Sequence, residues 1–255
     1  GRADTKEDIM GQVKVRTELL QYTSNPEVVV ATAAKLCYSD AGIAEIREGV
    51  ESKDISKFIQ KLVDMNHLSP IEHASFTFGV EGVSRSLLAQ LTRHRIASFS
   101  VKSQRYVRVR DFNYVIPPQI EALGEEAKAE YCRQMETMAG WYRGWVEKLE
   151  AGERGNEDAR FVLPNAAETK LVMTMNAREL MHFFSLRCCS RAQWEIREMA
   201  WQMLELVLAV APALFKNAGP ACVRGACSEG RMSCGRADEV RARQKALAEK
   251  TTKNA

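Results

Sequence analysis

A chain of 255 residues, of which 45% are hydrophobic and 27% charged, can bury a sizeable core and has the composition of a globular protein, which excludes disordered and fibrous classes. The apolar stretch 203–215 is interrupted by Glu205 and Pro212 and is too short to span a bilayer. The formal net charge of +3 is too small to indicate nucleic-acid binding by itself.

The N-terminal half mixes two kinds of hydrophobic pattern. Alternation of apolar and polar residues predicts strands, and apolar residues spaced three and four apart predict helices. Pro70 biases Ser69 away from helical angles, so a helix that approaches it must end before it. In chain order we predict a strand at 13–20, helices at 26–34 and 54–66, a strand at 74–80, a helix at 84–94, a loop at 96–103 and one or two strands over 106–115.

Helical patterns dominate the C-terminal half. The segment 167–175 fits either a strand or a helix, and we favour a helix. The other predicted helices span 125–150, 156–162, 176–187 and 192–211, and an Ala/Glu/Lys/Arg segment near the end could form a terminal helix. A few strands among dominant helices predict an α+β fold, with a central antiparallel or mixed sheet of few strands and several long helices.

The composition along the chain predicts one folded domain over 10–215. A tail follows at 216–255, with cysteine and glycine first and the helix-like segment after them. Residues 1–8 are polar, and residues 1–9 are expected to form a disordered or non-native end. No pattern of a secretory leader opens the sequence, and the cysteines number seven, so we expect a reducing compartment, the cytoplasm, with thiols that are free or bound to metal.

A basic segment carries the main functional signal. Residues 82–110 contain no Asp or Glu but seven cations, which predicts an anionic ligand. Within it, Arg93-His94-Arg95 is followed after seven residues by Ser103 and then by Arg105. Guanidinium groups bind phosphate oxygens in a bidentate manner, and hydroxyls and loop amides add neutral donors. Because Gln90 lies one helical turn before Arg93, it can reach the same phosphorylated ligand. The alternative, on these residues alone, is a solvated basic loop.

Arg-His-Arg, seven residues and Ser also resembles the signature of the flavin-dependent thymidylate synthases. Four further segments are similar to segments of that family and occur in the same order: His-Leu-Ser-Pro-Ile-Glu-His at 67–73 leading into Phe-Thr-Phe at 76–78, Ala-Arg-Phe-Val-Leu-Pro at 159–164, Asn-Ala-Arg at 176–178, and Arg187 followed by Ala-Gln-Trp-Glu-Ile at 192–196.

The resemblance implies an enzyme, a methyltransferase of dTMP biosynthesis that converts dUMP to dTMP. Methylenetetrahydrofolate would supply the carbon, and reduced FAD, regenerated by NADPH, would supply the hydride. No protein nucleophile would attack the substrate, so the protein would contribute orientation and electrostatics. The resemblance also implies a homotetramer whose sites combine residues from several chains, with no nucleic-acid or membrane partner.

The resemblance assigns site residues by position. Arg187 is the implied catalytic residue, because a cation against the uracil ring favours its ionised form. The residues implied to bind dUMP are Gln90, Arg93, Val101, Lys102, Ser103, Gln104, Arg105, Arg160 and Arg187, with Arg105 and Arg160 best suited to the phosphate. The residues implied to bind FAD are His73, Ser75, Arg93, His94, Arg95, Val101, Asn176, Arg178 and His182.

Two positions depart from the family pattern. Some members have a carboxylate or an amide just before a Leu-Ser pair, where this chain has Val101-Lys102-Ser103, so that only backbone contacts are implied at Val101 and Lys102. Arg191 stands where some members have a histidine near the flavin. At Ser103, substrate binding is favoured over a nucleophilic role, because the residue lacks an evident neighbouring base.

Three alternatives remain open at this point. The segment 85–110, with Phe99 and Tyr106 between its cations, could bind nucleic acid, in which case binding would depend steeply on salt. The chain could also be a catalytically inactive member of the family that binds flavin or nucleotide. No metal site is assigned, although Cys222, Cys227 and Cys234, with a fourth ligand from Cys188 or Cys189, are weak candidates for zinc or an iron–sulfur cluster.

Overall fold

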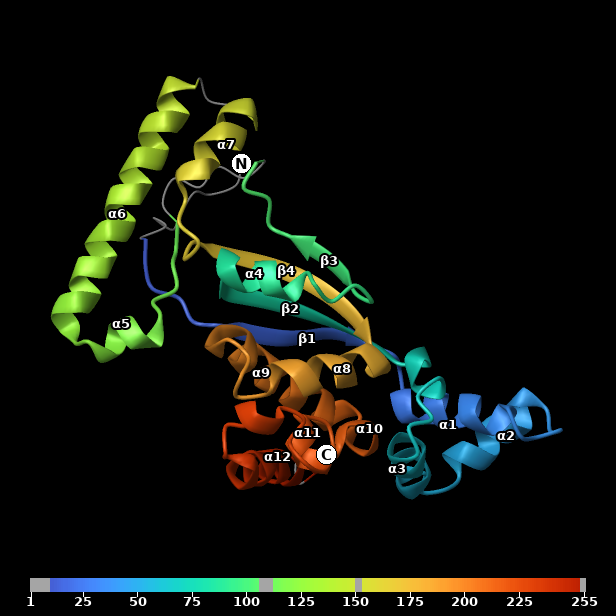
Figure 1. Ribbon diagram of the computed structural model, residues 1–255. Helices are drawn as coiled ribbons and strands as arrows, with labels where there is room; N and C mark the ends of the chain where they lie inside the picture. The colour runs from blue at the N-terminus through green and yellow to red at the C-terminus, as the bar shows by residue number, and fades with distance from the viewer. Residues whose placement is uncertain (1–9, 106–111, 150–152, 253–255) are drawn as a thin grey trace. The chain divides into compact units, whose positions relative to one another are not determined.

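A computed structural model describes residues 10–105, 112–149 and 153–252 (Figure 1). The chain divides into two compact units, and each is described by itself. Of the described residues, unit 1 comprises 10–16, 80–93, 100–105, 112–149 and 153–171, and unit 2 comprises 17–79, 94–99 and 172–252. None of the helices in these described ranges is long and apolar enough to cross a membrane.

Four strands form one antiparallel sheet in the order β1-β2-β4-β3. Their bounds are Arg16–Tyr22 for β1, Ser75–Ser84 for β2, Ser98–Val101 for β3 and Glu168–Asn176 for β4. The boundary between the two units falls within these strands. Side chains alternate between the faces of a strand, and the burial of Phe76, Phe78 and Val80 on β2 follows this period of two.

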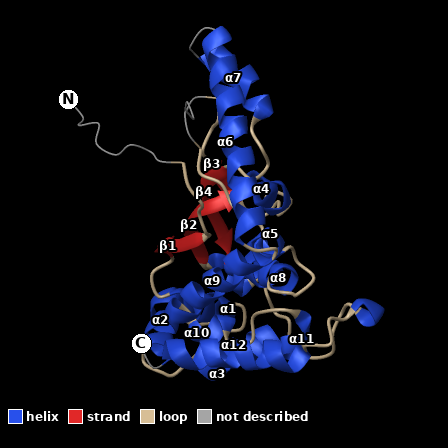
Figure 2. Ribbon diagram, turned by 90° about the vertical axis from the view of Figure 1, so that its left-hand side faces the viewer, coloured by secondary structure: helices blue, strands red, loops and turns tan. Residues whose placement is uncertain are grey.

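Unit 2 is built mainly of helices (Figures 1 and 2). The α-helices are α1 (Pro26–Leu36), α2 (Ile43–Glu51), α3 (Ser56–Asp64), α8 (Ala177–Arg187), α9 (Trp194–Val210), α10 (Pro212–Phe215), α11 (Ala221–Arg224) and α12 (Ala237–Thr252), and the 3₁₀ helices are η1 (Pro70–His73) and η3 (Gly230–Met232). Helix α9 contacts α8, α10 and α12. Phe215 packs edge to face on Phe76 and Phe184, with ring centroids 5.5 and 6.0 Å apart, so aromatic rings join β2, α8 and α10 in one core.

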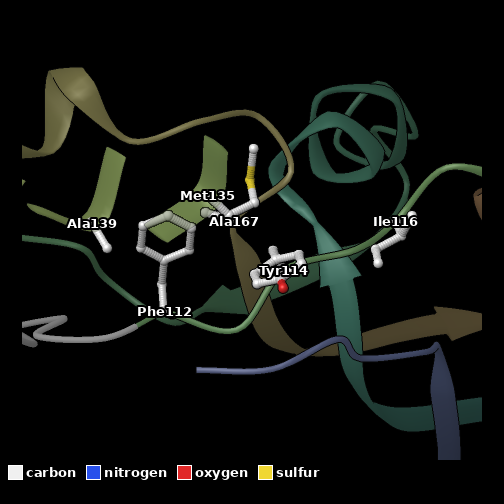
Figure 3. Packing of buried hydrophobic residues seen from close by; sticks show 6 residues of the cluster. All are labelled: Phe112, Tyr114, Ile116, Met135, Ala139 and Ala167. Carbon is white, nitrogen blue, oxygen red and sulfur yellow. The ribbon is translucent and has the colours of Figure 1, made fainter. Parts of the chain in front are cut away.

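Unit 1 contains α4 (Arg85–Leu91), α5 (Pro118–Ala122), the long α6 (Glu125–Lys148), α7 (Glu153–Ala159) and the 3₁₀ helix η2 (Arg160–Val162). Its core includes a cluster of buried side chains, shown in Figure 3, made of Phe112, Tyr114, Ile116, Met135, Ala139 and Ala167. Gly82 on β2 has φ +69°, and a Cβ atom there would lie 2.0 Å from the carbonyl oxygen of Lys14, so only glycine fits this position.

The α+β class and most of the predicted helices are confirmed. Helices begin at Pro26 and Glu125 as predicted, and the predicted terminal helix is α12. The prediction of a helix over 167–175 is wrong, because Thr169, Leu171, Met173 and Met175 are buried on one face of strand β4. The prediction of a loop over 96–103 is also wrong, since β3 lies within it.

Other boundaries differ from the prediction in smaller ways. Helix α2 was not predicted, and β1 begins three residues later than expected. Of the predicted strands over 106–115, residues 106–111 lie outside the described residues, and Tyr114 forms isolated bridges with Gln12 and Ala167. The expected disordered end at 1–9 also lies outside the described residues. The domain boundary at 215 remains a prediction.

Candidate active site

In unit 2, helix α8 and the segment after α4 bring together three polar side chains, Glu179, His94 and Arg187. Asn176 caps the helix by accepting the backbone N–H of Glu179 at 2.9 Å. The carboxylate oxygen Oε1 of Glu179 lies 3.0 Å from Nδ1 of His94, and Nε2 of His94 accepts the Nε–H of Arg187 at 3.1 Å. His94 and Glu179 are only 6% and 7% exposed, so their mutual contact is shielded from water, whereas Arg187 is half-buried.

The surroundings of His94 favour the neutral imidazole. Burial lowers the pKa of His94, and the cation of Arg187 and the ring of His182 lower it further, whereas Glu179 raises it. The balance of these effects is a pKa below the ordinary value of 6.5. A neutral His94 with its proton on Nδ1 donates to Glu179 and keeps a lone pair on Nε2 for Arg187.

Several residues implied to bind FAD lie around the first turns of α8. The backbone N–H of Ala177 donates to the carbonyl of Ala74 at 2.8 Å, which ties the start of α8 to the end of η1 beside His73. Arg178 forms an ion pair with Glu72 on the same 3₁₀ helix. The ring of His182, one turn along α8, lies 6.1 Å from the ring of His94. The side chains of His73, Arg178 and His182 are exposed.

In unit 1, residues implied to bind dUMP gather at α7 and η2. Arg105 forms an ion pair of 3.4 Å with Glu157, and Arg160 donates from Nε to the backbone carbonyl of Glu157 at 3.1 Å. The hydroxyl of Ser103 accepts the backbone N–H of Arg105 at 3.1 Å. Asn156 donates to the carbonyl of Arg105 at 3.4 Å. Glu157 therefore links Arg105 to Arg160, the two predicted phosphate ligands.

The remaining predicted residues lie on the segments next to these groups. Gln90 is in the last turn of α4, and Arg93 follows the helix, with its backbone N–H donating to the carbonyl of Gln90 at 3.4 Å. Val101 ends β3, and the backbone N–H of Lys102 donates to the carbonyl of Lys170 at 2.8 Å. Two further predicted residues, Ser75 at the start of β2 and Arg95, are exposed. Gln104 lies in the turn before Arg105.

The tail cysteines and Arg191 occupy a separate part of unit 2. Arg191 forms an ion pair with Glu229 at 3.1 Å and donates to the carbonyl of Met232 at 3.3 Å, so it contacts the segment that carries Cys227 and Cys234. All seven cysteines lie in the described ranges and carry free thiols. Among the residues whose placement is described, no group of three or more His, Cys, Asp or Glu side chains is arranged to hold a metal ion.

Sequence reasoning missed two acids that contact the predicted residues, namely Glu179 on His94 and Glu157 on Arg105. It counted Arg85 among the cations of the basic segment but gave it no place in the site, and the pKa of Arg85 is lowered by burial and by the nearby cation of Arg160. Glu179 stands three residues after Asn176, the spacing of a helix capping box, and this pattern could have drawn attention to it. No short-range pattern marks Glu157 as a partner of Arg105.

Comparison with known proteins identifies the family. The family model described as thymidylate synthase complementing protein matches residues 18–213. A flavin-dependent thymidylate synthase of Clostridium tetani is 52% identical over 89% of this chain and 96% of its own length, and one of Geobacter sulfurreducens is 52% identical over 89% and 97%. Among solved structures, the UMP/dUMP methylase PolB from Streptomyces cacaoi bound with 5-Br dUMP matches with a TM-score of 0.67 and 26% identity, covering 82% of this chain and 96% of that one. The chain therefore belongs to the thymidylate synthase complementing protein family, together with proteins named flavin-dependent thymidylate synthase.

Proposed function

We propose that this protein is a flavin-dependent thymidylate synthase, which converts dUMP to dTMP. Its carbon donor is methylenetetrahydrofolate, its cofactor is FAD, and its reductant is NADPH. The observation that carries the proposal is the match over 18–213, which includes every residue assigned to the site, supported by relatives of that name at 52% identity.

The residues of unit 2 fit a flavin dinucleotide. Arg95 and Arg178 are exposed cations of this unit, and guanidinium groups suit a diphosphate. Asn176, His73 and His182 offer polar groups for the ring system and the ribityl chain. When bound, reduced FAD supplies the hydride that the transferred carbon needs to become a methyl group.

The residues of unit 1 suit the nucleotide phosphate. Arg105 and Arg160 supply the charge, and Glu157 limits the directions in which their guanidinium groups can turn. Ser103 and the backbone amides after Val101 supply neutral donors. The resemblance gives Arg187, whose Nε–H donates to His94, the role of stabilising the negative charge that develops on the uracil ring.

The proposed enzyme works as a homotetramer in the cytoplasm, and its sites combine residues from several chains. Nucleic-acid binding by residues 85–110 is the competing function. It predicts an affinity for DNA or RNA that falls steeply with salt, whereas the proposed function predicts saturable binding of dUMP.

The test is an assay of the purified protein. It should contain FAD, seen as a flavin absorbance spectrum that bleaches on addition of NADPH, and should form dTMP from dUMP only when methylenetetrahydrofolate is present. Arg187→Ala should abolish dTMP formation and retain FAD. A protein that binds neither FAD nor dUMP, or that forms no dTMP with all components present, would refute the proposal.

A further inference from the structure

Glu179 is a buried acid to which the resemblance gives no function. It is 7% exposed and lies in the first turn of α8. A buried carboxylate is unfavourable unless it is paired or hydrogen-bonded. Here the N-terminus of the helix favours its negative charge, and Oε1 contacts Nδ1 of His94 at 3.0 Å.

We propose that Glu179 is a positioning residue for the methylation reaction, which acts through His94 to orient the guanidinium of Arg187. The inference rests on the proposed function, because it takes Arg187 as the group that acts on dUMP. It deepens that function by giving a role to a buried residue outside the sets implied to bind dUMP and FAD.

The chemistry of the three groups fixes the direction of each hydrogen bond. An ionised carboxylate only accepts hydrogen bonds, so the proton of the neutral imidazole lies on Nδ1. The lone pair then lies on Nε2. A guanidinium only donates, and its Nε–H meets Nε2 at 3.1 Å. If the proton moved to Nε2, two donors would face each other and Arg187 would turn away.

The ring of His94 has few other polar neighbours that could fix this tautomer. Among the described residues, the titratable or charged groups that affect His94 are Glu179, His182 and Arg187, all on α8. Phe183 packs edge to face on the ring at 4.9 Å, and His182 lies edge on at 6.1 Å. Glu179 is therefore the acceptor that decides which nitrogen carries the proton.

A purely structural role for Glu179 makes a different prediction. In a capping box, the third residue of the helix turns its carboxylate back to the N-cap backbone. The loss of such a contact would lower stability and leave catalysis unchanged. In this protein Oε1 of Glu179 contacts His94, 85 positions away in the chain, and the cap is supplied by the side chain of Asn176.

The experiment compares Glu179→Gln with wild type and with Glu27→Gln. Glu27 is a matched control, since it is a partly buried acid of unit 2 whose Oε1 accepts the backbone N–H groups of Ala213 and Leu214, neither of which is assigned to the site. For each protein we would measure FAD content, the melting temperature, the dissociation constant for dUMP, and kcat over a range of pH.

For Glu179→Gln we expect FAD to remain bound and kcat to fall at least tenfold, with a smaller change in KM for dUMP. The acid limb of the kcat profile should move to lower pH, because the carboxylate that raises the pKa of His94 is gone. Glu27→Gln should change only the melting temperature. In the background of Arg187→Lys, Glu179→Gln should weaken dUMP binding no further, because both changes remove the same contact.

Each failure has its own meaning. If wild type forms no dTMP, the proposed function fails. If wild type is active and Glu179→Gln matches the Glu27→Gln control in kcat and pH profile, the positioning role is refuted. Should Glu179→Gln not fold, Glu179→Asp takes its place. Aspartate keeps the charge but shortens its reach, so a kcat equal to that of wild type would overturn the inference.

Discussion

The guanidinium groups of Arg85, at the start of α4, and Arg160, in η2, lie close enough for the cation of Arg160 to affect the titration of Arg85. Burial and this nearby charge together lower the pKa of Arg85. In the described part of the chain, the Arg85 side chain has no carboxylate partner within an ion-pair distance. Two neighbouring cations repel each other, and an anion between them would relieve the repulsion.

We therefore expect Arg85 to strengthen phosphate binding at Arg160. Arg85→Gln should weaken dUMP binding about tenfold, the effect of losing a charge-assisted contact of about 1.5 kcal/mol. The same change should raise the melting temperature of the protein without nucleotide, because it removes the repulsion. Calorimetric titration with dUMP and thermal unfolding measure the two effects. The control is Arg16→Gln, an exposed partner of Glu81, and an Arg85→Gln protein that behaves like this control would contradict the expectation.

Ser103 provides a test of its assigned role. Its hydroxyl accepts the backbone N–H of Arg105 and so shapes the turn that presents this arginine. Ser103→Ala should weaken dUMP binding by about 1 kcal/mol, roughly fivefold in the dissociation constant, and leave measurable turnover. An inactive variant with normal dUMP affinity would point to a nucleophilic serine.

The contacts explain which parts of the fold could be predicted from the sequence. Helices with one apolar stripe, such as α3 and α9, were predicted because the stripe repeats within the helix itself. Strand β4 was mistaken for a helix because leucine and methionine are good helix formers. The alternation of buried and exposed side chains along β4 favours a strand only when neighbouring strands of the sheet bury one of its faces. Strand β3, with the sequence Ser-Phe-Ser-Val, alternates polar and apolar residues over only four positions, which is too short a pattern to separate a strand from a loop. It lies at the edge of the sheet, where backbone pairing defines it.

The site residues show the same difference between patterns within one segment and contacts between distant segments. The cations at 93–105 were found because they are concentrated in one segment without acids. Their acidic partners are distant in the sequence. Glu157 lies 52 positions after Arg105, and Glu179 lies 85 positions after His94. No spacing rule joins such pairs, and only the tertiary structure shows that the basic residues are oriented by carboxylates.

The buried neutral His94 makes stability depend on pH. Its folded pKa is below the ordinary value of 6.5, so the unfolded chain binds a proton more readily than the folded one. The neutral imidazole of His94 contributes its full share of the free energy of unfolding above about pH 6.5. This share is lost as the pH falls from 6.5 through the lower pKa of the folded protein. Urea unfolding between pH 7.5 and 5.5 should therefore show wild type losing more free energy of unfolding than His94→Gln. Equal slopes for the two proteins would exclude a buried neutral imidazole.

The thiols of Cys234 and Cys188 should differ strongly in reactivity. Cys234 is exposed, and its pKa is lowered by hydrogen bonds from the backbone N–H of Arg236 and from the side chain of Ser190. Burial raises the pKa of Cys188 well above its ordinary range. Because the thiolate is the nucleophile, iodoacetamide at pH 7.5 should modify Cys234 early and leave Cys188 intact in the folded protein.

Exposure alone would also make a cysteine accessible, and Cys37 serves as the reference because it too is exposed. Peptide mass spectrometry after limited alkylation should show Cys234 modified faster than Cys37. Ser190→Ala should slow the reaction at Cys234 and leave the rate at Cys37 unchanged, because it removes one of the groups that stabilise the thiolate. If Cys234 reacted no faster than Cys37 in wild type, accessibility and not local hydrogen bonding would control the chemistry of the tail thiols.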